Sequence, residues 1–177
     1  MKAIVFAALL AATLTLSAQS PVTRGDLSAP TTIAGYPCAA GYAWRYNNGS
    51  LKSCTLAADA PYGRYLAPAG SWIELAPDGR PHYLVLPRDT AFGAVTCHGG
   101  SLLGGAEGYT NVLYPTGELR TCWLAADQDI NGVPCRRATL FGGRDQAEFA
   151  ISGALRSCTL SHDFHGTTAG LRYNVTP

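Results

Sequence analysis

The stretch Gly117-Glu118-Leu119-Arg120-Thr121-Cys122-Trp123-Leu124, followed by Asp127, recurs along this 177-residue chain. Related copies begin at Gly49 and Gly153, and a degenerate copy begins at Gly79. Their shared pattern is G-x-L-[KR]-[ST]-C-x-L-x-x-D, and the four glycines are spaced 30, 38 and 36 residues apart. A period of this length predicts stacked supersecondary units, each too small to bury its own apolar face.

Each unit has the sequence of a β-hairpin. Turn residues stand at 47–49, 77–79 and 115–117, where glycine and asparagine tolerate positive φ and proline presets a turn. Aromatic and β-branched residues precede these turns, as is typical of strands. After the turns, apolar residues follow at every second position, as at Cys122 and Leu124. This spacing places them on one face of a second strand.

The apolar period predicts an all-β protein, because it is two rather than 3.6 outside the N-terminal stretch. We expect tandem β-hairpin repeats that form an elongated antiparallel sheet or a β-solenoid-like stack, stapled by disulfides. Period two also places the basic residues of the pattern on the same face as the cysteines, with their stems on apolar surface and their charges in water. These residues are Lys52, Arg120 and Arg156.

Both ends of the chain are expected to lie outside the repeats. Lys2 precedes an apolar run over 3–16 that ends in Ser17-Ala18, the layout of a secretory signal peptide. No later apolar run is long enough for a transmembrane segment in the mature chain. The predicted divisions are a signal peptide at 1–18, a leader at 19–33, a four-unit β-hairpin repeat domain at 34–166 and a C-terminal tail at 167–177.

The charge of the chain excludes some classes of partner. Its formal net charge is +1, and charged residues make up 14% of it, against about 25% in a typical soluble domain. A nucleic-acid binder or a polybasic membrane clamp needs concentrated positive charge. We therefore expect no nucleic-acid partner.

Six cysteines predict three disulfides and a secreted or periplasmic location, because an even number behind a signal peptide is typical of oxidising compartments. The C-x-x-C pairs that zinc sites usually use are missing from the sequence. In the degenerate unit, Leu66 and Leu84 stand where the other units have their first and second cysteine. Because both cysteines of this unit are replaced together, we infer that in the other units a disulfide joins these two positions. The predicted pairs are Cys38–Cys54, Cys97–Cys122 and Cys135–Cys158.

The turn and strand at Asn48-Gly49-Ser50-Leu51 and at Pro115-Thr116-Gly117-Glu118-Leu119 resemble the hairpin repeats of MORN-type proteins. They also resemble uncharacterised secreted bacterial proteins with a G-x-L-x-x-C-x-L repeat. The resemblance covers roughly residues 34–166 and implies a hairpin-repeat architecture. The chain lacks the G-x-W-x-x-G-x-x-x-G-x-G core of MORN repeats and carries cysteines. The resemblance therefore implies neither a catalytic residue nor a ligand.

One aspartate per unit forms a column of carboxylates. Each is expected to accept backbone N–H groups in the turn that closes its unit. A ladder that binds Ca²⁺ is the alternative and stays open, although the sequence has no D-x-D-x-D-G loop. The four residues are Asp59, Asp89, Asp127 and Asp163.

Histidines supply the candidates for catalysis or zinc binding. His162 and His165 flank Asp163, and such a group suits zinc, although exposed turn histidines explain it as well. His98-Gly99-Gly100 is similar to the oxyanion-hole glycines of esterases, but the G-x-S-x-G elbow of that fold is missing. The alternative function is therefore a small extracytoplasmic hydrolase using His98 or His162/His165. A third is a protease-inhibitor-like module that presents an exposed loop at 99–110.

Most aromatic side chains are expected in the core, because a thin β stack needs large side chains to seal it. Trp123 is the exception, since it alternates away from Cys122 and Leu124 and so faces outward as a candidate binding surface. The sequence thus predicts a non-catalytic secreted or periplasmic repeat protein with a binding or structural role. We expect no cofactor, no metal, and a protein or carbohydrate as the partner.

Overall fold

The computed structural model describes residues 22–100, 109–139, 146–168 and 171–175. Every regular element in these ranges is a β-strand, so the all-β prediction is confirmed. Ten strands belong to one large sheet. They are β1 (Val22–Leu27), β2 (Thr31–Ile33), β3 (Tyr36–Tyr46), β4 (Leu51–Leu56), β7 (Trp72–Leu75), β8 (Pro81–Val85), β11 (Thr110–Leu113), β12 (Leu119–Trp123), β15 (Gln146–Phe149) and β16 (Leu155–Ser157).

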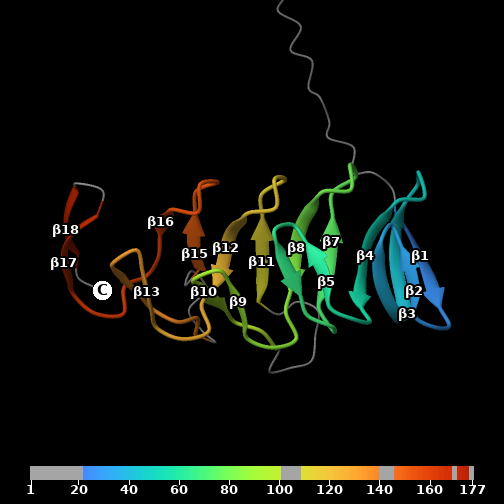
Figure 1. The fold of residues 1–177 in the computed structure, drawn as a ribbon, viewed down its shortest axis with the longest axis horizontal. Helices are drawn as coiled ribbons and strands as arrows, with labels where there is room; N and C mark the ends of the chain where they lie inside the picture. Colours follow the sequence, from blue (N-terminus) through green and yellow to red (C-terminus); the bar gives the residue numbers. More distant parts are fainter. Residues whose placement is uncertain (1–21, 101–108, 140–145, 169–170, 176–177) are drawn as a thin grey trace, which may run out of the picture.

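The strands of this sheet follow one another in the order β1-β3-β4-β7-β8-β11-β12-β15-β16, with β2 paired to β3. Each pair of neighbours is antiparallel. Figure 1 shows the strands side by side along the long axis of the molecule. The fold is therefore an elongated antiparallel sheet. The alternative, a β-solenoid-like stack, is wrong, because the hairpins pair edge to edge within one sheet.

The four large hairpins of the sheet end in the same turn. In β11–β12, the N–H of Tyr114 donates to the carbonyl of Glu118 and the N–H of Gly117 donates to that of Tyr114, both at 2.8 Å. The same two bonds recur at 46–50, 76–80 and 150–154. Gly117 has a φ of 90°, a conformation that favours glycine. This requirement explains the glycine at the start of each copy of the sequence pattern.

A β-bulge follows each of these turns. Val112 pairs with Thr121 but Leu113 pairs with Leu119, so β12 has one residue more than β11 at this point. The bulge lets Leu119 and Cys122 both be buried and leaves Arg120 exposed.

The same shift occurs in β4, β8 and β16, at Lys52, His82 and Arg156. The prediction that Lys52, Arg120 and Arg156 share the face of the cysteines is therefore wrong, because the bulge rotates them out of period two.

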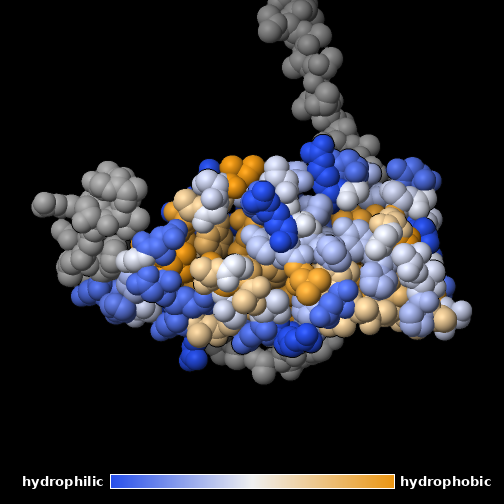
Figure 2. All heavy atoms as spheres, viewed as in Figure 1, coloured by the Kyte–Doolittle hydropathy of each residue, from blue (hydrophilic) through white to orange (hydrophobic). Residues whose placement is uncertain are grey.

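Three short hairpins connect the large ones. They are β5 (Ala60–Tyr62) with β6 (Tyr65–Ala67), β9 (Thr90–Phe92) with β10 (Val95–Cys97), and β13 (Gln128–Ile130) with β14 (Val133–Cys135). Their inward side chains, such as Tyr62 and Phe92, belong to the same buried core as Ile73 and Leu84 of the sheet. The short hairpins therefore cover one face of the sheet. Figure 2 shows polar and apolar residues interspersed on the face turned to the viewer.

Tyr62 fixes the hairpin β5–β6 to the sheet. Its hydroxyl accepts a hydrogen bond from the N–H of His82 at 2.9 Å, and it lies within hydrogen-bond distance of the carbonyl oxygens of Glu74 and Tyr83. Burial raises the pKa of Tyr62 well above its ordinary value. These bonds satisfy backbone groups at the bulge of β8, so the hairpin stabilises the irregular register there.

All three disulfides join the predicted pairs, Cys38–Cys54, Cys97–Cys122 and Cys135–Cys158. In the second unit, however, Leu66 is not the counterpart of the first cysteine. Ala60 pairs with Ala67 as Thr90 pairs with Cys97, so Ala67 holds that position.

Leu66 is 58% exposed, whereas Ala67 and Leu84 are both 0% exposed. The buried apolar residues that stand in place of a fourth bridge are therefore Ala67 and Leu84. The prediction of Leu66 is wrong because Leu66 points out of its hairpin.

The ends of the described chain differ from the predicted divisions. Residues 22–33, placed in a leader, form β1 and β2 of the sheet. At the other end, β17 (Phe164–Thr168) and β18 (Leu171–Val175) pair with each other, so the predicted boundary at 167 falls within a strand. The predicted signal peptide lies outside the described residues. The part of the chain that the structure describes contains no helix long and apolar enough to cross a membrane.

Candidate binding face

One face of the sheet is packed and the other forms what we call the outer face. A row of cross-strand partners points toward the short hairpins and is at most 1% exposed. This row is Ala43, Cys54, Ile73, Leu84, Asn111, Cys122 and Ala147. The residues that alternate with it point the other way. The outer face consists of Trp44, Ser53, Glu74, Tyr83, Val112, Thr121 and Glu148 in one row and Thr55, Trp72, Val85, Thr110, Trp123 and Gln146 in a second. Tyr42 belongs to the same face because it precedes the buried Ala43.

All three tryptophans of the chain lie on the outer face. Trp44, Trp72 and Trp123 are each partly exposed, and Tyr42 is 45% exposed. Trp123 thus faces outward, as expected from its alternation with buried neighbours. The prediction that most aromatic residues lie in the core is wrong, because the short hairpins and the disulfides fill the core instead.

Sequence reasoning missed Trp44 and Trp72 as surface residues. Trp72 precedes the buried Ile73 just as Trp123 follows the buried Cys122. The alternation that identified Trp123 would therefore have identified Trp72 as well.

Polar side chains stand opposite the aromatic ones across the strands. Ser53 pairs with Trp44, and Gln146 pairs with Trp123. Thr55 pairs with Trp72, whose other partner is Val85. Directly opposite side chains on one face are in contact range. Each tryptophan of the outer face therefore has a hydrogen-bonding side chain directly opposite it on a neighbouring strand.

Charges of both signs lie on the outer face near the turns. Lys52 Nζ is 3.8 Å from Glu74 Oε1, and His82 Nδ1 is 4.0 Å from the same oxygen. The Arg120 guanidinium lies 5.9 Å from the ring centre of Tyr114. These residues give the face no dominant sign of charge.

His82 predicts a pH dependence of stability. Desolvation by burial lowers the pKa of His82 below its ordinary value of about 6.5. The nearby carboxylate of Glu74 raises the pKa, but its effect is smaller. Just below pH 6.5 the unfolded chain therefore binds more protons at this residue than the folded chain, and the free energy of unfolding falls as the pH is lowered. Urea unfolding between pH 7.5 and pH 5 should show a smaller decline in H82Q than in the wild type. Parallel pH profiles for the two proteins would contradict this assignment.

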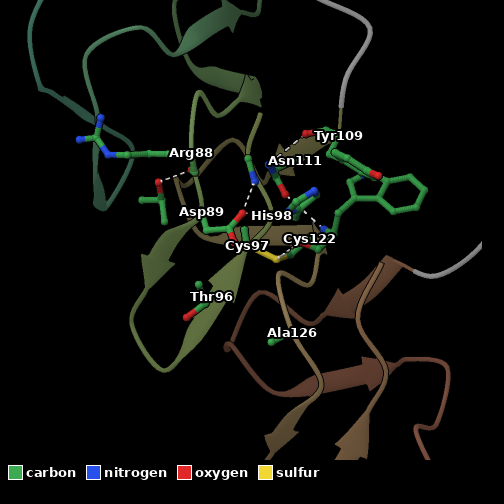
Figure 3. Close-up of polar contacts among 12 residues, drawn as sticks. Arg88, Asp89, Thr96, Cys97, His98, Tyr109, Asn111, Cys122 and Ala126 are labelled. Carbon is green, nitrogen blue, oxygen red and sulfur yellow. Dashed lines mark hydrogen bonds and ion pairs between the residues drawn. A yellow bond between two sulfur atoms is a disulfide. The ribbon is translucent and has the colours of Figure 1, made fainter. Parts of the chain in front are cut away.

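A cluster of side chains at the end of β10, which includes His98 and Asp89 (Figure 3), reaches Trp123 of the outer face. His98 Nδ1 is 2.7 Å from Asp89 Oδ1, and this contact orients the imidazole. The ring centre of Tyr109 is 4.4 Å from that of His98 and 5.4 Å from that of Trp123. Three rings thus adjoin one another, from His98 through Tyr109 to Trp123.

Buried Asn111 holds this cluster in place. Its Nδ2 donates to the carbonyl of Tyr109 at 3.2 Å, and its Oδ1 accepts a hydrogen bond from the N–H of Trp123 at 3.3 Å. Figure 3 shows the hydrogen bond between Asn111 and Tyr109. The amide therefore fixes the backbone on both sides of the ring stack.

The column of aspartates has the predicted structural role in three units. Asp59, Asp89 and Asp127 each accept a backbone N–H from the residue ten positions later, at 2.7–2.9 Å. Asp163 is exposed. The described residues contain no group of three or more His, Cys, Asp or Glu side chains that could hold a metal ion.

The histidine candidates fall at two separate places. His162 Nδ1 lies 3.0 Å from Ser161 Oγ. Both residues line a cavity of about 330 Å³ together with Asp127, Gln128, Asp129, Gly132 and Pro134. The surroundings of His98, beside Asp89 and Tyr109, share no residue with this cavity.

Two other sequence candidates are placed only in part. His165 lies in β17. Within the loop at 99–110, proposed as an inhibitory loop, residues 101–108 lie outside the described part of the chain.

No protein-family model, curated protein or solved structure matches this chain.

Proposed function

We propose that this chain is a non-catalytic binding protein of a secreted or periplasmic compartment, and that its ligand lies on the outer face of the sheet. The observation that supports this most is the position of Trp44, Trp72 and Trp123 together on that face. Tryptophan and tyrosine are enriched among the residues that dominate binding energies.

The remaining features support the compartment and the architecture. Three disulfides indicate an oxidising environment outside the cytoplasm. The recurrence of one turn, one bulge and one glycine in four hairpins favours tandem repeats of the MORN-like kind proposed from the sequence. Repeats of this sort build extended surfaces suited to long ligands.

Tryptophan fluorescence tests the proposal directly, because every tryptophan of the chain reports from the outer face. A ligand bound there should shift the emission and shield it from quenching by acrylamide. The L66A variant is the matched control. It removes an exposed apolar side chain from the short hairpin β5–β6, which lies on the opposite side of the sheet from the outer face. L66A should bind as the wild type does. A ligand that binds without changing the quenching of any tryptophan would contradict the proposal.

A hydrolase remains the second candidate, supported by the 2.7 Å contact between His98 Nδ1 and Asp89 Oδ1. A carboxylate that orients an imidazole in this way is a common part of general-base catalysis. Ester and glycoside substrates should then be hydrolysed by the wild type, and H98A should lose that activity while keeping its fold. Wild-type protein that hydrolyses none of them, or H98A that retains full activity, would exclude this candidate.

A further inference from the structure

We propose that the ligand of the outer face is an extended, uncharged polysaccharide that lies across the strands. This inference rests on the proposed function and specifies its ligand. It follows from the spacing of the rings, the groups beside them and the charge of the face.

The spacing of the tryptophans requires a long ligand. Trp44 lies on β3, Trp72 is two strands further along the sheet, and Trp123 is three strands beyond that. Neighbouring strands are about 4.8 Å apart, so the three rings span roughly 24 Å across the sheet. A single sugar ring contacts one of them, whereas a chain of several sugars laid across the strands contacts all three.

The groups beside the rings match the chemistry of sugars. A pyranose presents apolar C–H groups on its faces, which stack on aromatic rings, and hydroxyls at its edge, which need hydrogen-bond partners. The outer face offers hydroxyl and amide groups next to the tryptophans, at Ser53, Thr55 and Gln146. Tryptophans with polar side chains opposite them are thus complementary to a polysaccharide.

Two hydroxyls of the outer face lack a partner. Ser53 and Thr121 are 1% and 9% exposed, and neither hydroxyl bonds to any residue that the structure describes. Buried polar groups in native proteins are generally paired, so an unpaired one points to a missing partner. Sugar hydroxyls would supply that partner once the neighbouring side chains move aside.

The charges of the outer face and the distribution of its apolar side chains disfavour a polyanion and a protein as the ligand. Lys52 is paired with Glu74, and Glu148 lies in the same row as Glu74, so a polyanion would meet carboxylates along its path. A protein interface usually has a contiguous apolar centre. Here polar side chains separate the three tryptophans from one another, and apolar neighbours are limited to pairs such as Val85 beside Trp72 and Val112 beside Tyr83.

Binding of defined oligosaccharides tests the inference. Cellohexaose and chitohexaose, both extended β-1,4-linked chains, are titrated by calorimetry and tryptophan quenching, with their disaccharides for comparison. At least one hexasaccharide should bind about tenfold or more tightly than its disaccharide, because it reaches more than one ring. W72A and W123A should each weaken it by about tenfold, the effect of losing one well-packed contact. W123F should retain most of the affinity because it preserves a stacking surface, and L66A should not differ from the wild type.

Each other outcome has a distinct meaning. Absence of binding by both hexasaccharides at millimolar concentration would overturn the polysaccharide inference. If a protein or a polyanion shields the tryptophans instead, the inference fails while the proposed outer-face function stands. If a hexasaccharide binds equally well to W72A and W123A, the outer-face function itself fails. Equal affinity for hexasaccharide and disaccharide would refute an extended ligand.

Discussion

Reduction of the three disulfides should unfold this protein under otherwise native conditions. The bridges join residues 16, 25 and 23 positions apart, and loops of this size are worth about 3 kcal/mol each in the loop-entropy model. Their sum, at most about 9 kcal/mol because such contributions rarely add fully, is comparable with the whole stability of a typical domain. Far-ultraviolet circular dichroism should therefore show loss of the β signal when a phosphine reductant is added at neutral pH. A reduced protein that keeps the melting temperature of the oxidised one would contradict this expectation.

The second unit supplies the control for this experiment. It folds without a bridge, with Ala67 and Leu84 in the places of the two cysteines. The double variant C97A/C122L imitates that arrangement and should lose about 3 kcal/mol or less. C97S/C122S should lose more, because it buries two hydroxyls at a site where both cysteines are 0% exposed. Equal losses would show that apolar filling has no part in the second unit.

Local chemistry explains which features could be predicted from the sequence. The turns require a residue with positive φ, and glycine marks them in every copy. A cysteine without a partner is a liability in an oxidising compartment, so joint loss of two cysteines revealed the pairing. Both signals lie in the identity of particular residues, a glycine in one case and a pair of cysteine positions in the other, and both predictions are confirmed.

The bulges could not be predicted from periodicity, because they break it. Strict alternation places Arg120 with Cys122, whereas the pairing of Leu113 with Leu119 moves Arg120 to the other side. A signal was present in the pattern itself. Leu119 and Cys122 are both apolar and three residues apart, which a regular strand cannot place on one face. The error for Leu66 is similar. Leu66 was aligned with the first cysteine because it is apolar, whereas the strand pairing places Ala67 at that position.

Trp44 and Trp72 were missed as outer-face residues for a different reason. Aromatic residues are usually buried, and that expectation holds only where nothing else fills the core. Here the short hairpins supply Tyr62 and Phe92 to the core, and this covering layer has no signal in the pattern of the large hairpins. Trp44 and Trp72 were therefore assigned to the wrong side of the sheet.

Substitution of Gly63 by alanine should destabilise the protein far more than the same change at Gly93. Both glycines have a φ of 64° at the tip of a short hairpin, so both substitutions carry a similar backbone strain of about 1–3 kcal/mol. They differ in their surroundings. A Cβ on Gly63 would lie 2.6 Å from the carbonyl oxygen of Gly117, whereas one on Gly93 would have no described atom within 4 Å. Backbone cannot give way as a side chain does, so G63A should lose a further 1–3 kcal/mol or so, as overpacked cores do.

G63A and G93A together test one contact, the packing of the β5–β6 hairpin against the turn between β11 and β12. The N–H of Arg64 donates to the carbonyl of Gly117 at 3.2 Å, and Arg64 Nε is 3.2 Å from Glu118 Oε1. Urea unfolding of G63A, G93A and the wild type gives the two losses directly. The reciprocal pair is G117A and G79A, because a Cβ on Gly117 would lie 2.7 Å from Gly63 Cα and one on Gly79 would meet nothing. If the short hairpin holds the second unit against the third, G117A also loses more than G79A. Equal losses of unfolding free energy within both pairs would show that the tip of β5–β6 does not contact the turn between β11 and β12 in solution.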